Sequence, residues 1–250
     1  ASSGVLLRTS PGGGWGSTPA VVDAVVYVTD CDGYLSAHDA STGALLWQQS
    51  GTGRMSASPA VAAGVVYAGS SGDYRLYALD ANTGEVLWSY LTDNRIESSP
   101  AVADGIVYIG SWDRNLYALD AQTGALLWKY TTGSEILNSC PVVEAGVVYI
   151  QSSDGTLSAL DAASGELLWT LPFSGLSYSY YRDFCPAVAH GMVYIRSGDA
   201  TISAIDAVTA EYVWNYTTSG PVIKSPSLAN GIVYFGNNAG VVSALDAATG

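Results

Sequence analysis

The chain repeats the same pattern six times, at intervals of 40 to 45 residues. A proline followed by small and aliphatic residues recurs at Pro19, Pro59, Pro100, Pro141, Pro186 and Pro226. An Asp-Ala pair recurs in the same phase at Asp39, Asp80, Asp120, Asp161, Asp206 and Asp246. A tryptophan lies eight residues after the first five of these aspartates, at Trp47, Trp88, Trp128, Trp169 and Trp214. Three markers that keep one phase indicate that each repeat is one structural unit.

Each unit has the pattern of four short β-strands. In residues 99–130, alternating β-favouring runs are separated by Asp-Gly and Thr-Gly turns, which is typical of antiparallel strands. No segment has a sustained helical period with caps, so we expect essentially no helix. Four strands in about 40 residues match a propeller blade. The sequence therefore predicts an all-β, six-bladed β-propeller in one domain, residues 1–250, with blades starting near Thr18, Ser58, Ser99, Cys140, Cys185 and Ser225.

The two ends of the chain share one repeat phase. The last repeat stops at Gly250, before its fourth strand, and residues 4–8 match Gly43 to Trp47. We therefore expect residues 4–8 to complete the sixth blade and close the ring, which removes exposed strand edges. Residues 1–4 and 247–250 then compete for one position. Two explanations are open: one end frays, or the chain is cut from a longer repetitive polypeptide.

Charge and hydropathy exclude several classes of partner. The chain has 22 acidic and 9 basic residues, a net charge of −13, and no basic tract, so nucleic acids and anionic membrane surfaces are poor partners. No apolar run approaches the roughly 18 residues that span a bilayer, so no membrane insertion is expected. Only 12% of the residues are charged, about half the usual share.

One stretch of each repeat carries a family resemblance. Residues 118–128, A-L-D-A-Q-T-G-A-L-L-W, resemble the A-x-D-x-x-T-G-x-x-x-W signature of pyrroloquinoline-quinone (PQQ)-type β-propeller repeats. Further copies span residues 37–47, 78–88, 159–169 and 204–214, and a split copy joins residues 244–250 to 5–8. Three copies depart from the signature, with Ser164 in place of threonine, Ala210 in place of glycine and Arg8 in place of tryptophan. The resemblance implies that the tryptophans Trp47, Trp88, Trp128, Trp169 and Trp214 are structural and dock on neighbouring blades.

The same family includes quinoprotein dehydrogenases, which resemble larger, eight-bladed rings with calcium or a lanthanide, an aspartate base and adjacent cysteines. This chain has six repeats, and Cys31, Cys140 and Cys185 include no adjacent pair. Common hydrolase, zinc-protease and P-loop signatures are also absent from the sequence. We therefore expect no catalytic residue, metal or cofactor. A PQQ- and calcium-dependent dehydrogenase is the enzymatic alternative.

Candidate binding residues lie in the connections from one blade's outer strand to the next blade's inner strand. Arg54, Arg95 and Lys224 fall shortly before a repeat proline, which places positive charge at one mouth of an acidic ring. The 45-residue fifth interval adds a tyrosine-rich segment with Tyr178, Tyr180, Tyr181, Arg182 and Asp183. Such residues bind proteins or glycans. The alternatives are solvated charges and a loop that packs over the channel mouth.

Cys140 and Cys185 occupy the same repeat position, directly before the proline, in consecutive blades. Equivalent inner-strand residues near the axis can meet the limit of about 7 Å between Cα atoms that a disulfide requires. A bridge here would suit an oxidising compartment. Two buried thiols are the alternative.

These observations favour a non-catalytic binding, scaffold or sensor propeller outside the cytoplasm: extracellular, at the cell surface or in the periplasm. It resembles propeller lipoproteins of outer-membrane assembly and extracellular sensor parts of some kinases, a likeness of fold alone. The expected partner is a protein, or a small anionic or glycan ligand, at the loop face. A self-assembling surface or filament protein is a further alternative, suggested by the overlapping ends and the low charge.

Overall fold

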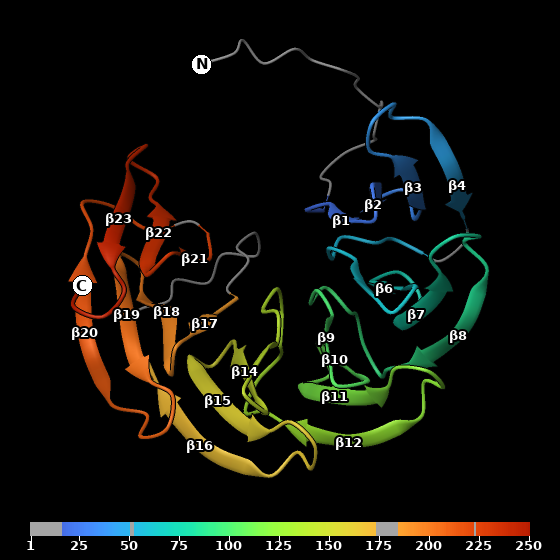
Figure 1. The fold of residues 1–250 in the computed structure, drawn as a ribbon. Helices are drawn as coiled ribbons and strands as arrows, with labels where there is room; N and C mark the ends of the chain where they lie inside the picture. The colour runs from blue at the N-terminus through green and yellow to red at the C-terminus, as the bar shows by residue number, and fades with distance from the viewer. Residues whose placement is uncertain (1–16, 51–52, 174–184, 223) are drawn as a thin grey trace.

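The computed structural model describes residues 17–50, 53–173, 185–222 and 224–250. These residues form strands joined by turns and contain no helix, and so none long and apolar enough to cross a membrane. The strands form six antiparallel sheets, as predicted, and five of the sheets have four strands (Figure 1). The all-β propeller architecture predicted from the repeats is confirmed.

The strand bounds follow the repeat. The first three sheets contain β1 (Ala20–Val22), β2 (Val25–Thr29), β3 (Leu35–Asp39), β4 (Leu45–Gln49); β5 (Ala60–Ala62), β6 (Val65–Gly69), β7 (Arg75–Asp80), β8 (Val86–Leu91); and β9 (Ala101–Ala103), β10 (Ile106–Gly110), β11 (Asn115–Asp120), β12 (Leu126–Thr131). The next three contain β13 (Val142–Glu144), β14 (Val147–Ser152), β15 (Thr156–Asp161), β16 (Leu167–Pro172); β17 (Ala187–Ala189), β18 (Met192–Gly198), β19 (Thr201–Asp206), β20 (Tyr212–Thr217); and β21 (Ser227–Ala229), β22 (Ile232–Gly236), β23 (Val242–Asp246).

The sheets lie around a common centre, with the first strand of each sheet innermost (Figure 1). Neighbouring sheets contact each other through these inner strands, in the series β1, β5, β9, β13, β17 and β21. Within a sheet the strands follow chain order. The sixth sheet has three strands among the described residues, and residues 4–8, which we expect to complete it, lie outside them.

The core consists of layers between adjacent sheets. One layer joins Tyr67 and Leu76 of the second sheet to Val107 and Ile109 of the third, and all four are buried. The next layer joins the third and fourth sheets in the same way. Because successive side chains of a strand point to opposite faces, the two central strands of each blade supply residues to two layers. The apolar positions of the repeat therefore fill inter-blade layers.

Each repeated tryptophan docks on the next blade. The register between β11 and β12 shifts between Ala118, which pairs with Trp128, and Leu119, which pairs with Leu126. The other four-stranded sheets have the same irregularity. The indole Nε1 donates to the carbonyl oxygen of the repeat alanine in the next blade at 2.9–3.1 Å, in the pairs Trp47–Ala81, Trp88–Ala121, Trp128–Ala162, Trp169–Ala207 and Trp214–Ala247. A tyrosine hydroxyl shares four of these acceptors, in the pairs Tyr27–Ala81, Tyr67–Ala121, Tyr108–Ala162 and Tyr194–Ala247.

The repeated aspartates organise the turn before the outer strand. Asp120 Oδ1 accepts hydrogen bonds from the backbone N–H groups of Gln122 and Thr123, and the equivalent aspartates do the same. Bonds to the charged form favour ionisation. Bonds from the Ser41 and Thr42 hydroxyls, followed by those from the turn N–H groups, lower the pKa of Asp39 to about 2. The hydroxyl and N–H of Thr123 lower the pKa of Asp120 in the same way.

Candidate functional site

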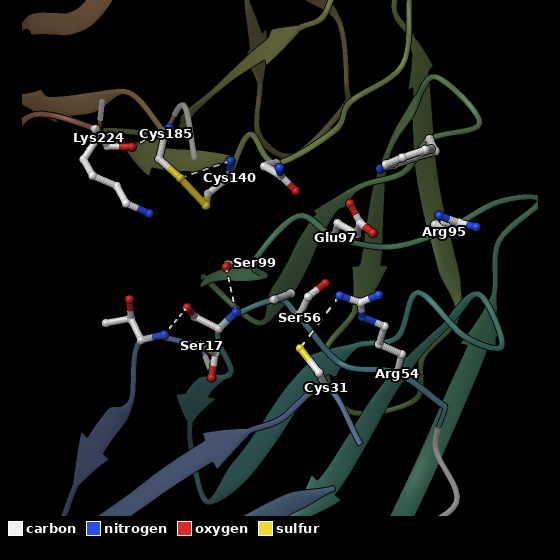
Figure 2. Close-up of a pocket in the computed structure, with 16 residues that line it drawn as sticks. Ser17, Cys31, Arg54, Ser56, Arg95, Glu97, Ser99, Cys140, Cys185 and Lys224 are labelled. Atoms are coloured by element: carbon white, nitrogen blue, oxygen red, sulfur yellow. Dashed lines mark hydrogen bonds between the residues drawn. A yellow bond between two sulfur atoms is a disulfide. The ribbon is translucent and has the colours of Figure 1, made fainter. Parts of the chain in front are cut away.

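The antiparallel order of each blade places two kinds of connection at one end of the molecule. The segment that enters each inner strand lies at the same end as the turn between the second and third strands. Around the centre these segments surround a cavity of about 900 Å³ (Figure 2). Its lining residues are Ser17, Thr18, Cys31, Arg54, Ser56, Ala57, Ser58, Arg95, Glu97, Ser99, Trp112, Asn138, Cys140, Cys185, Lys224 and Ser225.

The residues before the repeat prolines form a hydrogen-bonded rim inside this cavity. A proline holds the preceding residue in an extended conformation, and here that residue's N–H points to the next blade. The links are Thr18 N to Ser58 Oγ (3.0 Å), Ser58 N to Ser99 Oγ (3.0 Å), Cys140 N to Cys185 Sγ (3.3 Å) and Cys185 N to Ser225 Oγ (2.8 Å). The rim therefore ties consecutive blades together at the mouth.

A disulfide joins two members of this rim. The Sγ atoms of Cys140 and Cys185 are bonded, and their Cα atoms lie 4.7 Å apart. The bond links the fourth blade to the fifth, the pairing expected from the shared repeat position. Cys31 lies outside the disulfide, is half-buried, and accepts a hydrogen bond from the Arg54 guanidinium at 3.9 Å.

The structure brings Arg54, Arg95 and Lys224 to this one cavity, with all three side chains exposed. Figure 2 shows Lys224 and the disulfide on one side and Arg54 and Arg95 on the other. The Arg95 guanidinium lies 5.2 Å from the centre of the Trp112 ring, within the range of a cation–π interaction. The other predicted binding residues, Tyr178, Tyr180, Tyr181, Arg182 and Asp183, lie outside the described residues.

The predicted binding set lacks Ser56, Glu97, Trp112 and Asn138, all of which line the cavity. Burial raises the pKa of Glu97, and the charges of Arg95 and Arg54 partly counteract that effect. A signal for two of these residues is present in the sequence. Buried Met55 is followed by half-buried Ser56, and buried Ile96 is followed by half-buried Glu97. Because side chains alternate in direction along an extended segment, alternation of apolar and polar residues before the prolines indicates which positions face the cavity.

A family model covers nearly all of this repeat architecture. The model described as outer membrane protein assembly factor BamB matches residues 3–99, 92–179 and 181–250. The chain belongs to the BamB family. No curated protein sequence matches this BamB-family chain significantly.

Solved structures share the fold of this BamB-family chain. The computationally designed Ika8 protein superimposes with a TM-score of 0.79 at 21% identity, covering 92% of this chain and 70% of the design. BamB from Moraxella catarrhalis gives a TM-score of 0.60 at 21% identity, covering 91% and 81%. A europium-containing methanol dehydrogenase gives 0.73 at 16% identity, covering 93% and 67%. At these identities the likeness is one of fold alone.

The fold shared with a methanol dehydrogenase raises the question of a metal-bound quinone in the cavity. Glu97 is the carboxylate among the described lining residues. No group of three or more His, Cys, Asp or Glu side chains in the described ranges is arranged to hold a metal ion. Calcium requires six to eight oxygen ligands. The disulfide joins cysteines 45 positions apart and so differs from the adjacent cysteines that the resemblance to quinoprotein dehydrogenases implies. The residues that the structure describes therefore do not fit a calcium-bound quinone.

Proposed function

We propose that this BamB-family chain is a non-catalytic, protein-binding scaffold that acts in the periplasm in the assembly of outer-membrane proteins. The observation that carries the proposal is the family match across nearly the whole chain. The cavity supports it, because its rim is held in place by hydrogen bonds and a disulfide between blades. A preorganised surface loses less entropy when a partner binds.

Two features favour a non-catalytic role outside the cytoplasm. The cavity's described residues offer one carboxylate, and the described ranges contain no group of three or more His, Cys, Asp or Glu side chains that could hold a metal ion. The Cys140–Cys185 disulfide is suited to an oxidising compartment such as the periplasm. Both features agree with a module that positions other proteins.

Deleting the encoding gene in its own cell tests the proposal. Deletion is expected to lower the amount of β-barrel protein in isolated outer membranes, and a plasmid copy of the chain should restore it. Unchanged amounts would contradict the scaffold role. The enzymatic alternative is tested separately by adding PQQ and calcium to the purified protein, where we expect no reduction of an acceptor dye. A rate above that of buffer would favour a dehydrogenase.

Self-association is a second candidate function, favoured by the outer strands. Each outer strand of the first five blades is the last strand of its sheet and begins with exposed apolar residues, such as Leu45 and Leu46 (55% and 53% exposed) and Leu167 and Leu168 (43% and 51%). Exposed apolar residues on an edge strand are a common surface for strand pairing between copies. Light scattering of the purified chain tests this candidate: a concentration-dependent rise in mass supports it, and a constant mass of 25.9 kDa rules it out.

A further inference from the structure

Two hydrogen-bond donors in the cavity wall lack an acceptor among the described residues. Ser56 Oγ and Trp112 Nε1 are buried atoms, and neither forms a hydrogen bond within the described part of the chain. Both residues line the cavity. Trp112 differs in this respect from the repeat tryptophans, each of which donates to an alanine carbonyl. Because buried donors are rarely left unpaired, these two atoms are candidate donors to a ligand in the cavity.

The charges beside these donors favour an anion. Arg54 and Arg95 are exposed, and the ion pair found within the described ranges, Arg196–Asp199, involves neither of them. Lys224 adds a third positive charge on the other side of the cavity (Figure 2). The whole chain carries a net charge of −13. A local excess of positive charge on such a protein directs an acidic ligand to this cavity and away from the remaining surface.

Glu97 places one carboxyl group in the cavity wall, where burial raises its pKa and two arginines partly offset that rise. It lies three residues before Pro100, as Ser56 lies three residues before Pro59. The guanidinium groups of Arg95 and Arg54 both act on the Glu97 carboxylate and favour its charged form. A second carboxylate entering beside Ser56 would meet the same two guanidinium groups. It would also accept hydrogen bonds from the Ser56 hydroxyl and the Trp112 indole.

We propose that the cavity binds the carboxylate side chains of an acidic segment of a protein partner. Ser56 and Trp112 donate hydrogen bonds to these carboxylates, and Arg54, Arg95 and Lys224 balance their charge. The cavity, at about 900 Å³, is larger than one side chain requires and is within the range of sites that enclose a ligand of several groups. The choice of a peptide over a small acid rests on the proposed scaffold function.

Fluorescence anisotropy with the full chain tests the proposal. The probes are a short fluorescein-labelled peptide rich in Asp and Glu and a matched peptide with Asn and Gln in their place, at low ionic strength. We expect the acidic peptide to bind and the neutral one not to bind. Arg95→Gln should weaken binding about tenfold, the usual effect of losing one charge-assisted contact. Glu97→Gln should strengthen binding, because it removes a like charge from the wall.

Lys129→Gln is the matched control. Lys129 is exposed on the outer strand β12, outside the cavity lining, and its substitution changes the net charge by the same amount as Arg95→Gln. We expect it to leave peptide affinity unchanged. Equal weakening by both substitutions, or equal binding of the neutral peptide, would overturn the proposal. Arg95 and Lys129 are both exposed, so we expect neither substitution to disturb the fold. Unchanged melting temperatures of the two variants would verify this.

A free short-chain dicarboxylate, added as a competitor, separates the two possible sources of the carboxylate. Displacement of the peptide only at far higher concentrations supports a peptide site, whereas displacement at similar concentrations overturns it in favour of a small acid. The outcome is distinguishable from that of the gene deletion. Loss of outer-membrane β-barrels without binding of the acidic peptide would refute the carboxylate site and leave the scaffold role standing. Peptide binding without any effect of deletion would refute the scaffold role.

Discussion

At the scale of single residues, the turn glycine of four repeats lies against the tryptophan of the preceding blade, at Gly84, Gly124, Gly165 and Gly250. Gly124 has a φ of 72°, and a Cβ added to it would lie 2.6 Å from the Trp88 ring. The equivalent residue of the fifth repeat is Ala210, which adopts a φ of 60°, a left-handed conformation that is unfavourable for residues with a side chain. The fifth repeat therefore carries strain that its neighbours avoid.

Opposite substitutions at these two positions should have opposite effects. Gly124→Ala is expected to lower the free energy of unfolding by about 2–4 kcal/mol, through left-handed strain and overlap with Trp88. Ala210→Gly is expected to raise it by about 0.5–1 kcal/mol, because relief of strain outweighs the added freedom of the unfolded chain. Urea unfolding of the two variants measures both effects. A loss of stability in Ala210→Gly would contradict the strain assigned to this turn.

The repeated aspartates predict how stability depends on pH. The pKa of Asp39 in the folded protein is about 2, below its ordinary value of 3.8, so the unfolded chain takes up the proton first. The stabilisation from this group is complete above about pH 4 and is lost as the pH falls toward 2. The other five turn aspartates have lowered pKa values too. The melting temperature should fall over this range, and less steeply in Asp39→Asn. An equal slope in that variant would contradict the assignment.

At the scale of strands and blades, the rim at the mouth joins units that are distant in sequence. The fourth and fifth blades are linked at the rim by the Cys140–Cys185 disulfide. Serine occupies the equivalent position in the second, third and sixth blades, at Ser58, Ser99 and Ser225. A serine hydroxyl at this position accepts a hydrogen bond from the neighbouring blade. Replacing both cysteines with serine therefore removes the covalent bond while retaining the hydrogen-bonding group.

The double substitution Cys140→Ser, Cys185→Ser should reduce the free energy of unfolding by about 2–4 kcal/mol, the usual contribution of a disulfide that closes a loop of this length. A reducing agent should lower the melting temperature of the natural sequence and leave that of the double variant unchanged. Equal responses of the two proteins to the reducing agent would show that the bond does not stabilise the ring.

At the level of strands and blades, most of the fold could be predicted from the sequence. Repeat spacing, strand alternation and turn residues determine the six sheets, because each of these signals is local. The pairing of Cys140 with Cys185 was accessible through repeat position, since equivalent residues of adjacent blades face one axis. Ser56, Glu97 and Trp112 were missed, because they come together only when two blades and two kinds of connection meet at the mouth. For Ser56 and Glu97 the signal is the alternation of apolar and polar residues before the prolines, whereas Trp112, in the turn between β10 and β11, has no such signal.

At the scale of the whole molecule, we propose that the partner binds at one end of the propeller. Thr18 is exposed and lines the cavity. Gln122 is also exposed, but it lies in the turn between β11 and β12, at the opposite ends of the strands. A photo-crosslinking amino acid at either position leaves the charged residues of the cavity in place. The pair therefore compares the two faces of one folded protein.

Crosslinking in living cells from these two positions tests whether a partner binds at the mouth of the propeller. With the photo-crosslinking residue in place of Thr18, we expect an adduct with a protein of the outer-membrane assembly machinery. With the same residue in place of Gln122, we expect no such adduct. An adduct formed only from position 122, equal adducts from both positions, or none from position 18 would contradict a scaffold that binds its partner through the mouth of the propeller.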